Sequence, residues 1–122
     1  KKRILSIESD LSPNNLCDFL SDKSLSKIGI TYDTGNVIAN GYNTKEYINI
    51  LHSRIYGLHI KDRGHLFSKT VKLGTGDVPF DYIFKNSFKL KFLKDITLQS
   101  SRSEDNYIND IKSNLKFVKK LL

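Results

Sequence analysis

Apolar and polar residues alternate along this chain with two different periods, which predict strands and helices in turn. Short apolar runs typical of buried strands occupy residues 3–8, 27–32, 54–60 and 92–99. Each run is followed by a segment in which apolar residues recur at i, i+3 and i+4, the spacing of one helix face. These segments predict helices that begin near residues 13, 44, 80 and 103.

Polar residues mark the starts of the predicted helices. Ser12-Pro13 places a hydroxyl at the N-cap and a proline at the first helical position. Thr44 and Ser103 are predicted to cap the second and fourth helices in the same way. The polar segment 61–79 joins the third strand to the third helix, and a loop of that length in a small domain is usually functional.

Four successive strand-helix units predict an α/β fold with parallel strands and helices packed outside them. Four such units are half of a (β/α)8 barrel, whose whole is typically about 250 residues. The chain has 122 residues and no methionine, even at position 1, which favours a fragment. Such a half barrel exposes two sheet edges and much of an apolar interior. We therefore expect a missing N-terminal half, or a second chain, to complete the barrel.

Composition and charge exclude several classes of protein. No apolar run approaches the about 20 residues needed to span a bilayer, so no membrane partner is expected. The single cysteine, Cys17, cannot form an internal disulfide and favours the reducing cytoplasm. The net charge of +7 attracts polyanions or phosphorylated small molecules. Because the lysines are scattered rather than clustered, a nucleic-acid partner is not expected.

Polar residues end each of the four predicted strands, at spacings of 25, 26 and 40 residues: Glu8, Asp33, His59 and Gln99. The carboxyl ends of parallel strands converge on one site, so these side chains are expected to meet. Carboxylates with an imidazole suit Mn²⁺, Mg²⁺, Co²⁺ or Zn²⁺. Each residue also has a structural explanation. Asp33 can stabilise a turn and His59 can be a hydrogen-bonded core residue. Glu8 and Gln99 can be solvated residues at strand ends.

Three segments carry a family resemblance: YDTGN (32–36), LHIKDR (58–63) and LGTGDVPF (73–80). In this order they resemble the C-terminal half of sugar phosphate isomerases/epimerases of the xylose-isomerase-like barrel superfamily. The resemblance covers nearly the whole chain, and its second and third segments are its specific part. It implies that residues 1–122 are the C-terminal half of a xylose-isomerase-like TIM barrel domain.

The resemblance also implies roles for the strand-end residues. Glu8, Asp33 and His59 are implied metal ligands on the fifth, sixth and seventh barrel strands. Gln99 falls where such enzymes usually carry a ligand glutamate on the eighth strand. A glutamine oxygen can bind a metal but cannot act as a general base near neutral pH. Glu8 is then the one strand-end carboxylate left for proton transfer, which favours one-base isomerisation or dehydration over two-base epimerisation.

Residues on the adjoining loops are expected to bind substrate: Asn36, Asp62, Arg63 and Arg102. A surface ion pair is the alternative explanation of Asp62 and Arg63. Further basic residues on these loops can receive a substrate phosphate, although a solvated surface explains them equally well: Lys61, His65, Lys69 and Lys72.

The function expected from this pattern is a metal-dependent isomerase or epimerase acting on a small sugar or sugar phosphate through an enediolate. An apurinic-site nuclease like endonuclease IV is an alternative that the net charge favours. Three histidines in the whole chain are few for the metal cluster of such a nuclease. A degenerate half barrel that acts as an interaction module is the other alternative, favoured by Gln99 and by the missing half.

Overall fold

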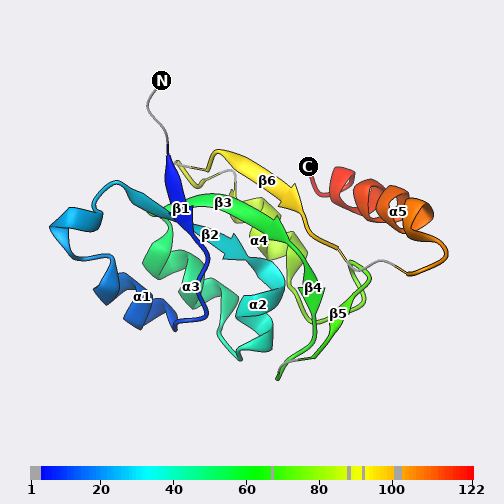
Figure 1. Cartoon of the computed structure of the whole chain (residues 1–122), viewed down its shortest axis with the longest axis horizontal. Helices are drawn as coiled ribbons and strands as arrows, with labels where there is room; N and C mark the ends of the chain where they lie inside the picture. The colour runs from blue at the N-terminus through cyan, green and yellow to red at the C-terminus, as the bar shows by residue number, and fades with distance from the viewer. Residues whose placement is uncertain (1–3, 67, 88, 92, 101–102) are drawn as a thin grey trace.

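The molecule is built on a sheet of four parallel strands in the order β1-β2-β3-β6 (Figure 1). This computed structural model describes residues 4–66, 68–87, 89–91, 93–100 and 103–122. The strands are β1 (Leu5–Ile7), β2 (Ile28–Asp33), β3 (Ile55–Ile60) and β6 (Asp95–Leu98). The predicted four parallel strands are confirmed. Strands β1, β3 and β6 are shorter than the predicted runs, and β2 has the predicted length but lies one residue later. Arg3 and Phe92, the predicted starts of the first and last strands, lie outside the described residues.

Helices follow the strands as the apolar spacing predicted. They are α1 (Pro13–Phe19), α2 (Thr34–Ala39), α3 (Thr44–Leu51), α4 (Phe80–Ser87) and α5 (Tyr107–Lys119), with a short 3-10 helix at Lys23–Leu25. Helix α2 was not predicted, because its first residues were interpreted as a simple turn. The segment 61–79 contains an antiparallel pair of short strands, β4 (Asp62–Arg63) and β5 (Thr70–Val71).

Two of the three predicted helix caps are corrected by the structure. Ser12 caps α1 as predicted, accepting a hydrogen bond from the Asn15 N–H. Asn43, not Thr44, caps α3, because its side-chain oxygen reaches two free N–H groups of the first turn. The Thr44 hydroxyl instead accepts from the buried Tyr32 phenol. Ser103 precedes α5, whose N-cap is Asn106.

The hydrophobic core lies between the sheet and the helices on one of its faces. Alternate strand residues point into it and are fully buried: Ile30, Tyr32, Leu58 and Ile60. They pack in one cluster with apolar residues of α1, α3 and α4: Leu16, Tyr47, Ile48, Leu51, Ile83 and Phe84. Burying each such side chain contributes about 1.5–3 kcal/mol, so this cluster is the main source of stability.

The opposite face of the sheet, which lines the inside of the half barrel, is polar. Strand alternation places Ser6, Thr31, Asp95 and Thr97 on it, and the hydroxyls of Ser6 and Thr31 lie 2.9 Å apart. The expected exposure of an apolar interior is therefore wrong. The apolar runs of the strands face the helices, and the inward positions between them carry hydroxyls and carboxylates.

A bulge between β2 and β3 changes which residues share a face. Ile30 pairs with Ile55, but the next pair is Thr31 with Gly57, so Tyr56 is an extra residue on β3. Asp33 consequently pairs with His59. Without the extra residue Asp33 would pair with Leu58, and His59 would point towards the helices.

Among the described residues no further strand pairs with β1 or β6, so both edges of the sheet are open, as expected for half of a barrel. The chain begins at the β1 edge and ends beyond the β6 edge (Figure 1). Apolar side chains are exposed on these strands and along α5: Ile4, Leu5, Ile96, Ile108, Ile111 and Leu115. Helix α5 is attached through Val118, which is buried, and Phe117, whose ring meets the edge of Phe80. Within the described ranges, no helix has the length and apolar composition to cross a membrane.

Candidate metal centre

Three polar side chains meet where β1, β2 and β3 end. Glu8 follows β1, Asp33 ends β2 and His59 lies one residue before the end of β3. One oxygen or nitrogen of each lies within 4.8 Å of those of the other two. The convergence arises because the strands are parallel and the bulge aligns Asp33 with His59. Three of the four predicted ligands are therefore brought together.

The two carboxylate oxygens of Asp33 make different contacts. Its Oδ1 caps α2 by accepting a 2.8 Å hydrogen bond from the Asn36 N–H. Its Oδ2 is buried and makes no hydrogen bond of acceptable geometry with the described residues. The ammonium of Lys61 lies 2.9 Å from Oδ2, close enough for an ion pair. The structural explanation of Asp33 therefore applies to Oδ1, whereas Oδ2 takes no part in the cap and is paired with Lys61.

The side chains of Glu8 and His59 lie close together at the carboxyl ends of the strands. Glu8 Oε2 lies 3.1 Å from His59 Nδ1, and the side chains are 37% and 24% exposed, respectively. The Nδ1 atom is buried, yet the two groups are not aligned for a hydrogen bond. A carboxylate oxygen and a ring nitrogen that lie close without bonding are suited to share a third group, such as a cation.

Asn36 connects the cluster to the neighbouring loop. Its Nδ2 donates to Glu8 Oε1 at 2.9 Å, and its Oδ1 accepts from Arg63 Nη1 at 3.0 Å. Arg63 is itself held by a 2.7 Å bond from Nε to the Ser68 carbonyl. The predicted substrate-binding residues Asn36 and Arg63 therefore lie beside the cluster, linked in a chain that orients the Glu8 carboxylate.

Asp62 has a different environment from the one expected of a substrate ligand. It is fully buried. Its oxygens accept from four N–H groups of one loop: those of Gly74, Thr75, Gly76 and Val78. The carboxylate thereby organises the loop before α4 and has no surface for a substrate. We therefore leave Asp62 out of the substrate-binding set.

Gln99 lies at the fourth strand end, as predicted. Its N–H donates to the Ile60 carbonyl at 3.0 Å, continuing the β3–β6 ladder by one residue. Thr97 pairs with His59, and strand alternation places Gln99 on the same face of the sheet. Gln99 is exposed, and it follows β6, the strand that pairs with β3. The remaining predicted substrate residue, Arg102, lies outside the described residues.

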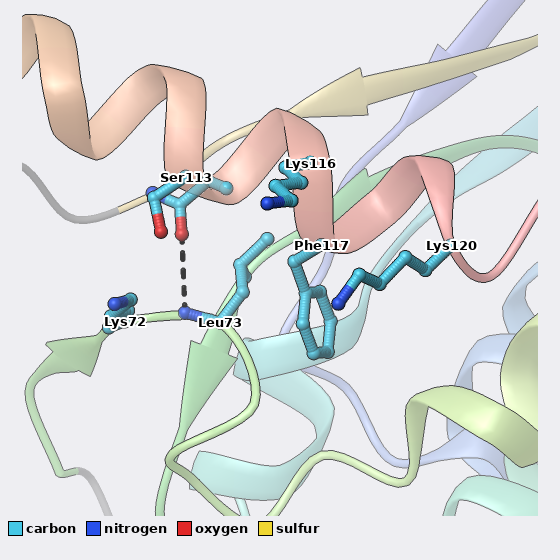
Figure 2. Close-up of a pocket in the computed structure, with 7 residues that line it drawn as sticks. Lys72, Leu73, Ser113, Lys116, Phe117 and Lys120 are labelled. Atoms are coloured by element: carbon cyan, nitrogen blue, oxygen red, sulfur yellow. Dashed lines mark hydrogen bonds between the residues drawn. The ribbon is translucent and has the colours of Figure 1, made fainter.

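Other basic residues of the 61–79 segment are distributed differently. Lys61 contacts Asp33 in the cluster. From the sequence, a solvated surface position was equally expected for it. His65 is exposed, with its N–H bonded to Asp77. Lys72 borders a separate hollow of about 280 Å³ between this segment and α5, together with Lys116, Phe117 and Lys120 (Figure 2). That hollow shares no residue with the cluster.

The donor set fits a divalent cation. Two carboxylates and an imidazole are ligands that Mn²⁺, Mg²⁺, Co²⁺ and Zn²⁺ accept. Asp33 Oδ2 and His59 Nδ1 are buried and form no hydrogen bond among the described residues; each is instead in an ion-pair contact, with Lys61 Nζ at 2.9 Å and with Glu8 Oε2 at 3.1 Å. Because buried polar atoms are nearly always hydrogen-bonded, two that are held only by ion-pair contacts in one cluster leave room in their bonding for a further ligand.

Comparison with known proteins shows the fold. No protein-family model matches the sequence, and no curated protein matches it at a significant level. Among solved structures, a xylose isomerase domain protein from Planctomyces limnophilus is similar over 98% of this chain, with 23% identity and a TM-score of 0.83. The chain spans 46% of the length of that protein.

Two further structures extend the comparison. A xylose isomerase-like TIM barrel protein from Mycobacterium smegmatis, in complex with magnesium, matches 97% of this chain at 16% identity and TM-score 0.74. A D-allulose 3-epimerase from Methylomonas sp. matches 98% at 18% identity and TM-score 0.69. The chain spans 43% and 49% of these proteins. The predicted fold, half of a (β/α)8 barrel, is thus confirmed.

Proposed function

We propose that this chain is the C-terminal, metal-binding half of an isomerase or epimerase that acts on a small sugar or sugar phosphate. The observation that carries the proposal is the cluster of Glu8, Asp33 and His59, with ligand atoms within 4.8 Å of one another at the ends of parallel strands. The structural likeness to a sugar epimerase supports the kind of reaction.

The residues of the cluster would have two roles, to bind a cation and to transfer a proton. Asp33 Oδ2, His59 and one oxygen of Glu8 would hold the ion, with Gln99 as a further oxygen ligand. A bound divalent cation would polarise the substrate carbonyl and stabilise the negative charge that develops as the adjacent proton leaves. Glu8 is the proton acceptor, and the Asn36 amide keeps its carboxylate facing the site.

The reaction that fits this set uses one base. Glu8 would remove a proton from the hydroxyl-bearing carbon next to the carbonyl and return it to the former carbonyl carbon, while the hydroxyl proton moves to the former carbonyl oxygen; together these transfers interconvert an aldose and a ketose. Gln99 cannot supply a second base on the opposite face near neutral pH. Arg63, joined to Asn36 but not to a carboxylate among the described residues, can bind substrate oxygens or a phosphate.

The proposal includes a completed barrel. The four-stranded sheet with open β1 and β6 edges would be closed by an N-terminal half or by a second chain, which would also supply the rest of the substrate pocket. We place the protein in the cytoplasm, because its single cysteine, Cys17, is free and exposed.

One alternative has a specific observation in its favour. The exposed apolar residues on β1, β6 and α5 would suit an interaction module with no catalytic role. The nuclease alternative has less support, since the described residues contain one group of three His, Asp or Glu side chains with metal-ligand spacing. Multi-metal sites of that kind need more ligands.

The test is a calorimetric titration of Mn²⁺ into the 122-residue protein. We expect saturable one-to-one binding that Asp33→Asn and His59→Ala abolish. Asp95→Asn is the matched control, because Asp95 lies on the same face of the sheet but at the opposite end of its strand. Binding that survives Asp33→Asn, or is lost equally in Asp95→Asn, would contradict the assignment.

Gln99→Glu extends the same titration. A third carboxylate in the site should tighten Mn²⁺ binding, because a charged oxygen replaces a neutral one. Affinity that is unchanged in this variant would place residue 99 outside the metal site. A screen of aldose and ketose substrates then tests catalysis, with the variant lacking His59 as the inactive reference.

A further inference from the structure

Lys61 holds an unusual position in the candidate metal centre. Its ammonium lies 2.9 Å from Asp33 Oδ2, the buried oxygen that the proposed metal would use, and the two side chains are 16% and 1% exposed. We propose that Lys61 is a built-in counter-cation that holds Asp33 in the metal-free protein and that a divalent cation must displace. This inference rests on the proposed metal site and concerns how that site is loaded.

The backbone of Lys61 is fixed from both sides by one hydroxyl. The Lys61 N–H donates to Thr34 Oγ1 at 3.0 Å, and the Thr34 hydroxyl donates to the Lys61 carbonyl at 2.5 Å. Thr34 is the residue after Asp33, at the start of α2. The strand end that carries Lys61 is therefore tied directly to the strand end that carries Asp33.

The stem of Lys61 reaches Asp33 across a glycine. A Cβ placed on Gly35 would lie 2.9 Å from Lys61 Cγ and 3.1 Å from Cδ, closer than such atoms normally approach. Because Gly35 has no side chain, there is space for the aliphatic part of the Lys61 side chain to reach Asp33. Position and path together indicate a defined location for the ammonium, unlike that of a solvated surface lysine.

An ammonium and a divalent cation cannot share Asp33 Oδ2, because like charges at contact distance repel strongly in a partly buried site. A buried carboxylate without a partner is costly, so Lys61 stabilises the metal-free protein. The same contact opposes metal binding, because it must be broken first. Asn36 Oδ1, 3.5 Å from the ammonium, is the acceptor to which Lys61 can move.

The two effects have opposite signs, which separates this role from a purely structural one. Removing the charge of Lys61 should weaken the metal-free fold and tighten metal binding. A lysine that only supports the local structure would, when removed, weaken both.

The experiment compares wild type with Lys61→Met, which keeps the stem and removes the charge. In EDTA, the variant should unfold at a lower temperature. In calorimetry with Mn²⁺ alone, its dissociation constant should be roughly tenfold smaller, a typical size for coupling between two cations that compete for one group. Lys45→Met is the matched control, because the Lys45 ammonium lies over the Tyr82 ring, away from the cluster.

Gly35→Ala gives a second variant that keeps the lysine. The added methyl should push the stem off its path and tighten Mn²⁺ binding in the same direction, by a smaller factor. If Lys61→Met fails to fold, tighter binding in Gly35→Ala supports the inference, and equal or weaker binding overturns it.

The outcomes distinguish this inference from the proposed function. Equal or weaker Mn²⁺ binding by Lys61→Met, with binding by wild type, overturns the role of Lys61 and leaves the metal site standing. Binding by Lys61→Met alone supports the inference in its strongest form. The absence of binding in both proteins overturns the metal site itself, and with it this inference.

Discussion

Asn36 illustrates how one uncharged side chain and its backbone can organise a charged site. Its N–H engages Asp33, its amide nitrogen engages Glu8, and its amide oxygen accepts from Arg63. This pattern also fixes the orientation of the amide, since the opposite orientation would place two acceptors together at Glu8 and two donors together at Arg63. Glu8 is thereby held in place although its side chain is largely exposed.

Asn36→Ala should weaken Mn²⁺ binding by about 10–100-fold, the usual effect of removing a residue that orients a metal ligand. The N–H to Asp33 is retained in this variant, so α2 should persist. Asn40→Ala, at the C-cap of α2, is the control, because the Asn40 amide contacts Asp10 outside the cluster. Calorimetry measures both variants, and equal affinities would show that Glu8 needs no support from Asn36.

The register between β2 and β3 is decided by a single extra residue. Tyr56 is that residue, and its ring covers Gly29 on the neighbouring strand. A Cβ on Gly29 would lie 2.1 Å from Tyr56 Cδ2 and 2.2 Å from Cγ, so a side chain there is incompatible with the observed ring position. Gly29 therefore permits the bulge that places His59 beside Asp33.

Gly29→Ala should lower the free energy of unfolding by about 1–3 kcal/mol, the range for added atoms in a packed region. Urea denaturation measures this change. If the clash with the ring is the cause, the same substitution in a Tyr56→Ala background should cost much less. Additive effects of the two substitutions would mean that Gly29 matters for another reason.

The whole molecule has its core on one side of the sheet, and two tyrosines lie in that core. The rings of Tyr32 and Tyr47 are stacked with centroids 5.0 Å apart. Burial raises the pKa of both phenols, because their charged forms would lose hydration. The folded protein therefore keeps these protons at pH values where the unfolded chain loses them.

The stability should consequently fall at alkaline pH. A raised folded-state pKa gives a contribution that is complete below the unfolded pKa, about 10, and is lost as the pH rises above it. Tyr32→Phe should make this fall shallower, and Tyr107→Phe, at an exposed position, should leave its slope unchanged. Chemical denaturation between pH 8 and 11.5 measures the slopes. A slope that is the same in Tyr32→Phe would contradict the burial argument.

The sequence by itself predicted the four parallel strands and the helices α1, α3, α4 and α5. Strand runs and helix faces follow from local periodicity, and the Ser12-Pro13 cap needs only neighbouring N–H groups. Because parallel strands end at one edge of a sheet, the order of elements predicted that Glu8, Asp33 and His59 lie at the same edge. The information lay in the regular spacing of the strand-helix units, which can be read from the sequence alone.

The tertiary structure decided what each of these residues contacts. The position of Lys61 on Asp33 depends on a hydroxyl and a glycine on another strand end, and the pairing of Asp33 with His59 depends on a bulge. Asp62 was expected at the substrate, but its carboxylate is enclosed by loop N–H groups 12 to 16 residues away. Contacts between distant segments depend on register and loop path, and neither leaves a periodic signal in the sequence.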